Sequence, residues 1–136
     1  MNQIKKVFLV IFLALGFAIV FAEAPADFAV EAIQIPGNGF IHIKLANRSP
    51  NAVSLTPQTM EKTFVTVYIN NIRRAEYKVK YIDRRLFQPQ GRILLRTNFR
   101  IQGPQRIKIV CNQQRIFKEI NFSNNILEKT IRPNGN

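Results

Sequence analysis

The sequence predicts an all-β protein, an immunoglobulin-like antiparallel β-sandwich of about seven strands. Three observations lead to this prediction. Apolar and polar residues alternate with a period of two in short runs along most of the chain. Gly, Pro and Asn separate these runs at regular intervals, as in sandwich proteins. After residue 25, no apolar stripe with a period of 3.6 residues is long enough for a helix.

The first 22 residues are expected to lie outside the folded domain. Lys5 and Lys6 precede an uncharged apolar run of 16 residues, which ends in the small-residue pattern Val20-Phe21-Ala22. This is typical of a signal peptide cleaved after Ala22, and the run is shorter than the roughly 20 residues that a spanning helix needs. An uncleaved membrane anchor is the alternative. We therefore expect residues 23–136 to form one domain that is secreted or periplasmic.

The expected strands follow one another along this domain. They cover residues 27–35, 40–45, 64–69, 77–81, 92–96, 106–111 and 126–131. In the first strand the alternation slips between Ala32 and Ile33, as a β-bulge would cause. The residues expected to point into the core are Ile41, Ile43, Leu45, Val65, Val67, Ile69, Ile107, Ile109 and Cys111, and those expected to point outward in the third strand are Phe64, Thr66 and Tyr68. The single cysteine excludes an internal disulfide, so we interpret Cys111 as a small core residue.

Turn residues connect these strands. Pro, Gly and Asn at 36–39 turn the first strand into the second, and a longer loop covers 48–62. Asn70 and Asn71 can supply the left-handed residues of a tight hairpin. Two further turns are expected at 89–91 and 103–104. Asn124 and Asn125 suit a tight corner before the last strand, because Asn tolerates a positive φ; a ligand role for them is the alternative.

Four segments resemble a known family in their order and spacing. They are PADFAV at 25–30, LANRS at 45–49, FVTVYIN at 64–70, and Glu119 followed by NFSNN at 121–125. Together they resemble a CARDB-type domain, the cell-adhesion-related sandwich of exported bacterial proteins. The resemblance implies a sandwich fold with a binding or adhesion role and no catalytic residues. Two departures, NQQR at 112–115 in place of an Asp-rich loop and Phe122 at a second acidic position, argue against a calcium role.

The positive charge of the chain is concentrated in its middle. The whole sequence carries a net charge of +12, and residues 73–118 hold 13 Lys and Arg against two acidic residues, a net of +11. If strand 64–69 lies between strands 77–81 and 106–111, its outward residues lie between lysines and arginines. The predicted binding residues are Tyr68, Lys78, Lys80, Arg106 and Lys108, with Arg73, Arg74, Arg84 and Arg85 at the loop rims.

Such a basic face with an aromatic residue suits an anionic partner outside the cytoplasm. We expect an anionic polysaccharide, a lipid head group or a protein, and no specific nucleic-acid recognition. A solvated surface that keeps a small exported protein soluble is the alternative interpretation of the same charges.

The composition argues against an enzyme. His42 is the only histidine, no Gly-x-Ser-x-Gly elbow is present, and the acidic residues are scattered. We expect no cofactor and no metal. The leading hypothesis is an exported, non-enzymatic binding or adhesion module. Its alternatives are a structural subunit that pairs through a strand edge, and a small inhibitor that presents loop 48–62 to an extracellular enzyme.

Overall fold

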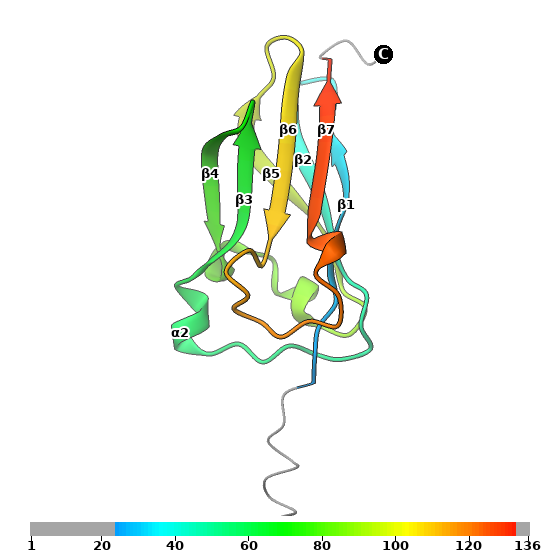
Figure 1. The fold of residues 1–136 in the computed structure, drawn as a ribbon, viewed down its shortest axis with the longest axis vertical. Helices are drawn as coiled ribbons and strands as arrows, with labels where there is room; N and C mark the ends of the chain where they lie inside the picture. The colour runs from blue at the N-terminus through cyan, green and yellow to red at the C-terminus, as the bar shows by residue number, and fades with distance from the viewer. Residues whose placement is uncertain (1–23, 133–136) are drawn as a thin grey trace, which may run out of the picture.

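The computed structural model describes residues 24–132, which form two antiparallel sheets packed face to face (Figure 1). One sheet has the order β1-β2-β5, with β1 at Phe28–Gln34, β2 at Phe40–Asn47 and β5 at Arg92–Arg100. The other has the order β4-β3-β6-β7, with β4 at Ile72–Lys78, β3 at Thr63–Ile69, β6 at Gln105–Cys111 and β7 at Ile126–Ile131. The predicted seven-stranded sandwich is confirmed. The predicted leader, residues 1–22, lies outside the described residues.

The period-two alternation places the core between the two sheets. All nine side chains expected to point inward from β2, β3 and β6 are buried, Cys111 among them. Burial also raises the pKa of the Cys111 thiol well above its ordinary value, so the group stays protonated at neutral pH. The interpretation of this cysteine as a core residue is therefore confirmed.

The fourth strand differs from its predicted position. The sequence predicted a strand at 77–81, whereas β4 covers Ile72–Lys78 and Val79–Tyr81 forms a 3₁₀ turn, η1. The reason is the hairpin at Asn70 and Asn71, whose φ angles are 50° and 65°. Two consecutive left-handed residues close the turn at once, so β4 begins directly after them.

Among residues 24–132, four short helical segments also depart from the prediction of strands alone. They are α2 at Pro57–Met60 and three 3₁₀ turns, η1, η2 at Arg84–Phe87 and η3 at Ser123–Asn125. The helix α2 lies inside loop 48–62, where Thr56 and Thr59 cap each other and Pro57 begins the turn. None of them has the length that a periodic apolar stripe would reveal.

Four phenylalanines pack together at one end of the core. Phe28, Phe64, Phe87 and Phe117 are all fully buried, and the ring centroids of Phe28 and Phe64 lie 4.9 Å apart. The expectation that Phe64 points outward is wrong, because the loops that carry Phe87 and Phe117 cover this end of β3. Thr66 is buried as well, and it lies beside the buried Val110 of the neighbouring strand. The register of β3 against β4 shifts between Thr63 and Val65, which breaks the regular alternation there.

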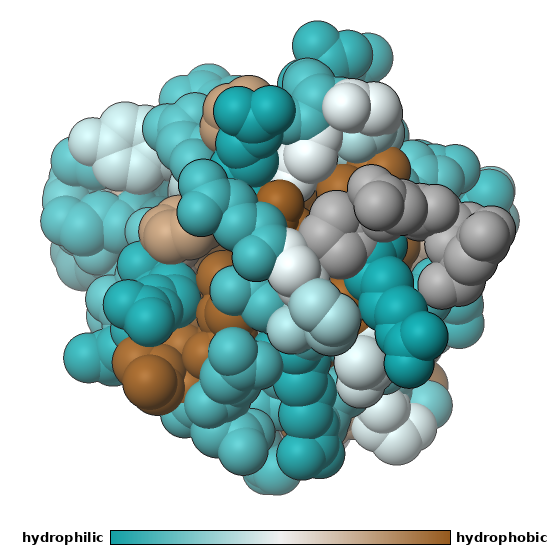
Figure 2. All heavy atoms as spheres, turned by 90° about the horizontal axis from the view of Figure 1, so that it is seen from above, coloured by the Kyte–Doolittle hydropathy of each residue, from teal (hydrophilic) through white to brown (hydrophobic). Residues whose placement is uncertain are grey.

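The two ends of the sandwich differ. The hairpin turns gather at the upper end in Figure 1, and α2 with the longer connections gathers at the lower end. Figure 2 shows the upper end covered mostly by hydrophilic residues, with small apolar patches between them. The charged residues and the two hollows described below lie on the outer faces of the two sheets and at the lower end of the sandwich.

Within the described residues, no helix is long and apolar enough to cross a membrane.

Candidate functional site

The predicted binding residues come together only in part. As expected, β3 lies between β4 and β6. Tyr68 is registered opposite Arg73 on β4 and opposite Lys108 on β6. The amino group of Lys108 lies 4.6 Å from the centroid of the Tyr68 ring. These three residues form a continuous row across the outer face of the four-stranded sheet.

Lys78 and Lys80 do not flank Tyr68, because β4 ends five residues beyond Arg73 and the chain then turns in η1. Lys78 is registered opposite Thr63, and Lys80 lies in the 3₁₀ turn. Both amino groups contact the carboxylate of Glu61, at 3.3 Å from Lys78 and 2.9 Å from Lys80. Their hydrogen bonds lower the pKa of Glu61, that from Lys80 most, so the carboxylate stays ionised and offsets one of the two positive charges.

Three other predicted cations are each paired with an acidic neighbour. Arg73 pairs with Glu76 at 2.8 Å, Arg85 pairs with Asp83 at 2.6 Å, and Arg106 pairs with Glu128. Arg74 and Arg84 are exposed on β4 and η2 and make no ion pair within residues 24–132. The outer face of the four-stranded sheet is therefore less basic than the charge count of the middle section indicates. The binding role of the nine residues stays a prediction.

A row of positive charge also lies on the opposite sheet. Arg92, Arg96 and Arg100 are exposed at four-residue intervals along β5, which places them on one face of the strand and roughly 13 Å apart. Lys44 on β2 is registered opposite Leu94, between the first two arginines. We call the set Lys44, Arg48, Arg92, Arg96 and Arg100 the basic stripe. Among the described residues, its members Lys44, Arg96 and Arg100 make no ion pair.

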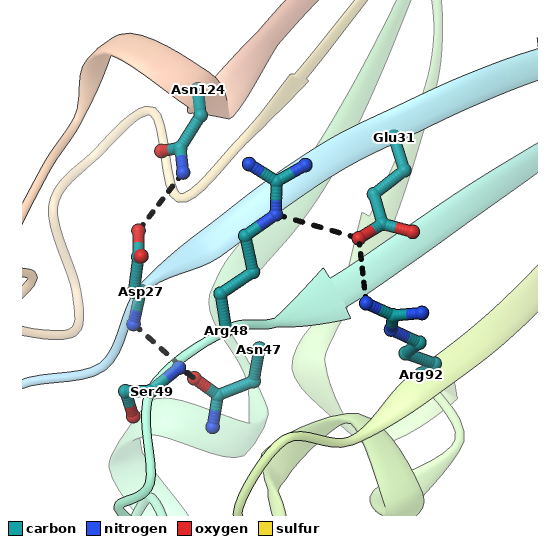
Figure 3. A network of polar contacts seen from close by, with 7 residues as sticks. All are labelled: Asp27, Glu31, Asn47, Arg48, Ser49, Arg92 and Asn124. Carbon is teal, nitrogen blue, oxygen red and sulfur yellow. Dashed lines mark hydrogen bonds and ion pairs between the residues drawn. The ribbon is translucent and has the colours of Figure 1, made fainter.

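Glu31 is paired with the two cations at the Arg92 end of the basic stripe. Arg48 and Arg92 come from different strand ends and both point toward Glu31, at 3.4 Å and 3.6 Å from the same oxygen (Figure 3). Glu31 is the extra residue of a β-bulge, since the register of β1 shifts between Val30 and Ala32. The bulge thus occurs slightly earlier than the predicted slip. Because two guanidinium groups share one carboxylate, the corner keeps a net positive charge.

A hollow of about 480 Å³ opens beside this corner, lined by Asn47, Arg48, Gln90 and Arg92. Asn47 fixes its floor. The amide oxygen of Asn47 accepts the backbone N–H groups of Asp27 and Ser49, and its nitrogen donates to the carbonyls of Asn51 and Gln88 (the Asp27 and Ser49 contacts are drawn in Figure 3). One buried side chain therefore ties together the start of β1, the end of β2 and the turn before β5.

The closing motif has a structural role. The carboxylate of Glu119 is 8% exposed and accepts hydrogen bonds from the Phe28 backbone, Asn112 and Asn125. Asn124 donates to Asp27 at 2.9 Å, a bond drawn in Figure 3. Burial raises the pKa of Glu119, although these hydrogen bonds oppose the shift. The two asparagines thus form a corner as expected, but positive φ angles occur at Asn112 and Arg115 instead.

Sequence reasoning missed the basic stripe as a unit, although its signal was present. The predicted strand ended at residue 96, whereas β5 extends to Arg100. The equal spacing of Arg92, Arg96 and Arg100 was the available signal, because residues four apart in a strand share a face. Lys44 and Arg48 lie about 50 residues earlier in the chain, and only the pairing of β2 with β5 brings them to these arginines.

Comparison with solved structures identifies the same fold elsewhere. The chain is similar to a crystal structure of the CARDB domain of the PF1109 protein from Pyrococcus furiosus in complex with di-metal ions, with 21% identity, a TM-score of 0.57, and coverage of 79% of this chain and 92% of that one. A solution NMR structure of that domain gives a TM-score of 0.56, with 21% identity and coverage of 79% and 94%. No protein-family model and no curated protein matches the sequence. The CARDB-type fold expected from the sequence is thereby confirmed.

The described side chains do not form a site for metal ions such as those bound in the Pyrococcus furiosus crystal structure. Within residues 24–132, no group of three or more His, Cys, Asp or Glu side chains is placed to hold a metal ion. Glu119, the buried carboxylate of the closing motif, already accepts hydrogen bonds from three groups of the protein. Arg115 stands in the loop that precedes it.

Proposed function

We propose that the chain is an exported, non-enzymatic adhesion-type module that binds an anionic polymer of the cell surface through the basic stripe. The likeness to CARDB domains supports the module, and the apolar run at residues 7–22 supports export. The stripe is the single observation that carries the ligand class. Four of its five cations lie on strands β2 and β5, and Glu31 is the acidic residue paired with it.

The geometry of the stripe fits an extended polyanion better than a compact one. From Arg92 to Arg100, the three arginines span roughly 26 Å of one strand. The guanidinium groups present planar donors that match carboxylate, sulfate or phosphate groups. His42 beside Arg96, and Phe40 beside Arg100, add contact surface along the same line. A linear acidic polysaccharide can therefore contact several of these groups at once.

The alternative of assembly through strand edges has less support. An unpaired edge strand recruits another chain most readily when it is long, flat and apolar. The β5 edge carries Arg92, Arg96 and Arg100, and the β4 edge carries Arg73, Arg74 and Lys78. Charged side chains on an edge discourage pairing, so we favour electrostatic binding.

Heparin chromatography of two matched variants tests the proposal. The first replaces Lys44, Arg96 and Arg100 by Glu, and the second replaces Arg73, Lys78 and Lys80 by Glu. Both variants change the net charge by the same amount, but the first changes β2 and β5 while the second changes β4 and η1. We expect the first to elute at much lower salt than the wild type, and the second to elute close to it.

Three outcomes would contradict the proposal. Equal loss of retention in both variants would mean that net charge alone governs binding. A larger loss in the second variant would place the binding face on the residues predicted from the sequence. Salt-resistant oligomers in size-exclusion chromatography would favour strand-edge assembly instead.

A further inference from the structure

A second hollow lies on the other sheet, outside the proposed binding face. Its volume is about 220 Å³, and it opens where β6 ends, beside the turn at Asn112 and the start of β7. Lys108 and Arg115 supply its charge, while Phe122, Val110 and Ile126 supply apolar surface. The basic stripe shares no residue with this pocket, since its strands belong to the opposite sheet.

The two cations are held against aromatic rings. The Lys108 amino group lies 4.6 Å from the Tyr68 ring centroid, and the Arg115 guanidinium carbon lies 4.5 Å from that of Phe122. Neither cation makes an ion pair in the part of the chain that the structure describes. A cation held over a ring face keeps its charge and its orientation, and both remain available to an anion.

The backbone fixes the position of Arg115. Its φ is 52°, in the left-handed region, and its N–H donates to the Asn112 carbonyl at 2.9 Å. The Asn112 side chain in turn holds both the N–H and the carbonyl of Phe117. A bulky residue rarely adopts this conformation unless its surroundings hold it there, and such positions concentrate at functional sites. The turn therefore presents Arg115 in one place.

Two side-chain amides add polar groups to the pocket. Gln113 accepts a hydrogen bond from the Tyr68 hydroxyl at 3.1 Å, which leaves its amide nitrogen available as a donor. Asn125 is 3% exposed, and its amide oxygen has no hydrogen-bond partner among residues 24–132. A buried polar atom without a partner calls for an explanation, and an unfilled ligand contact is one.

We infer that this pocket binds a carboxylated sugar residue, a hexuronate unit of an acidic glycan. Arg115 and Lys108 would take the carboxylate, and the amides of Gln113 and Asn125 would bond ring hydroxyls. The C–H face of the sugar would lie on Phe122 and Ile126. Inorganic phosphate would contact only the two cations and would leave the apolar side chains Phe122 and Ile126 without a contact.

Isothermal titration calorimetry with tetragalacturonate tests this inference. We expect binding to the purified protein at low salt, and no binding of neutral maltotetraose. Arg115→Gln removes a charge-assisted contact and should weaken binding about 10-fold. Phe122→Ala should weaken it by several fold through the lost sugar contact. Lys62→Gln is the matched control, because Lys62 is exposed outside the pocket, and it should bind as the wild type does.

The basic-stripe variant with Glu at positions 44, 96 and 100 separates this inference from the proposed function. It should lose heparin retention and still bind tetragalacturonate within about 3-fold of the wild type. Loss of tetragalacturonate binding in that variant, with Arg115→Gln unaffected, would overturn the pocket and leave the stripe intact. No binding by the wild type, or equal competition by millimolar inorganic phosphate, would also overturn it.

Discussion

The carboxylate of Glu119 accepts the backbone N–H of Phe28 at 2.7 Å, which joins the first strand to the last loop across 91 residues of sequence. The neighbouring backbone strengthens this link, since Ala26 donates to the Lys118 carbonyl and accepts from Ile120. The same carboxylate binds the amide groups of Asn112 and Asn125. One buried acid thus holds β1 to the end of β6 and to the corner before β7.

Replacing Glu119 by Gln should destabilise the fold by about 2 kcal/mol at pH 7. A glutamine oxygen can still accept from the two asparagines, but its NH₂ group then faces the Phe28 N–H. Two donors would meet, and the buried backbone group would lose its acceptor. Urea denaturation of both proteins measures the difference. An unchanged midpoint would show that Glu119 does not hold the strand.

The same pair of proteins should differ in the pH dependence of unfolding. Burial raises the folded-state pKa of Glu119 above its ordinary value of 4.5, so the folded protein keeps this proton to higher pH than the unfolded chain. The contribution of this group to the free energy of unfolding therefore falls as the pH rises from 4.5 through the folded-state pKa. The wild-type advantage over Glu119→Gln should be largest near pH 4.5 and then decline to a plateau. An advantage that grows with pH would contradict the assignment.

Replacing Asn47 by Ala should cost about 3 kcal/mol of stability. The change leaves two backbone donors, one of them buried, and two carbonyls without the amide that bonds them. Asn38→Ala is the control, because the Asn38 side chain makes one bond, to Phe40, in an exposed turn. Its loss should stay near 0.5 kcal/mol in the same denaturation experiment. Equal losses of stability in the two variants would show that the Asn47 side chain does not hold these segments together.

Replacing Gly91 by Ala should destabilise the protein by roughly 3 kcal/mol. A Cβ atom there would lie 1.9 Å from the carbonyl oxygen of Arg85, so the backbone of η2 or of the turn must move. Gly37→Ala offers the matched control, since a Cβ at Gly37 meets nothing within 4 Å. Thermal unfolding should show a large fall in Tm for the first variant and almost none for the second. A similar Tm for both would mean that the turn yields freely.

Local patterns predicted most of the strands. Alternation marked the cores of β2, β3 and β6, and the two asparagines at 70–71 marked a hairpin, because these signals depend on neighbouring residues alone. The limits of β4 were missed because its first three residues, Ile72 to Arg74, are all exposed and show no apolar-polar alternation in burial. Phe64 was misplaced because its cover comes from Phe87 and Phe117, which lie far along the chain.

The candidate site was harder to predict, since it depends on contacts between distant residues. Glu61 pairs with Lys78 and Lys80 across 17 and 19 residues of sequence, and no local pattern shows this. A charge count over residues 73–118 also mixes strands of both sheets, because β5 belongs to one and β6 to the other. The sequence therefore revealed the excess of positive charge, but which sheet carries that charge depends on the strand order, which the sequence did not reveal.

An amide chemical-shift map of the ¹⁵N-labelled protein during titration with a heparin hexasaccharide tests the central proposal most directly. If the basic stripe is the binding face, the largest shifts will occur along β2 and β5, around Lys44, Arg96 and Arg100, and will fade as salt is added. Shifts centred on β3 and β6 instead, or none along β5 at low salt, would contradict the proposal.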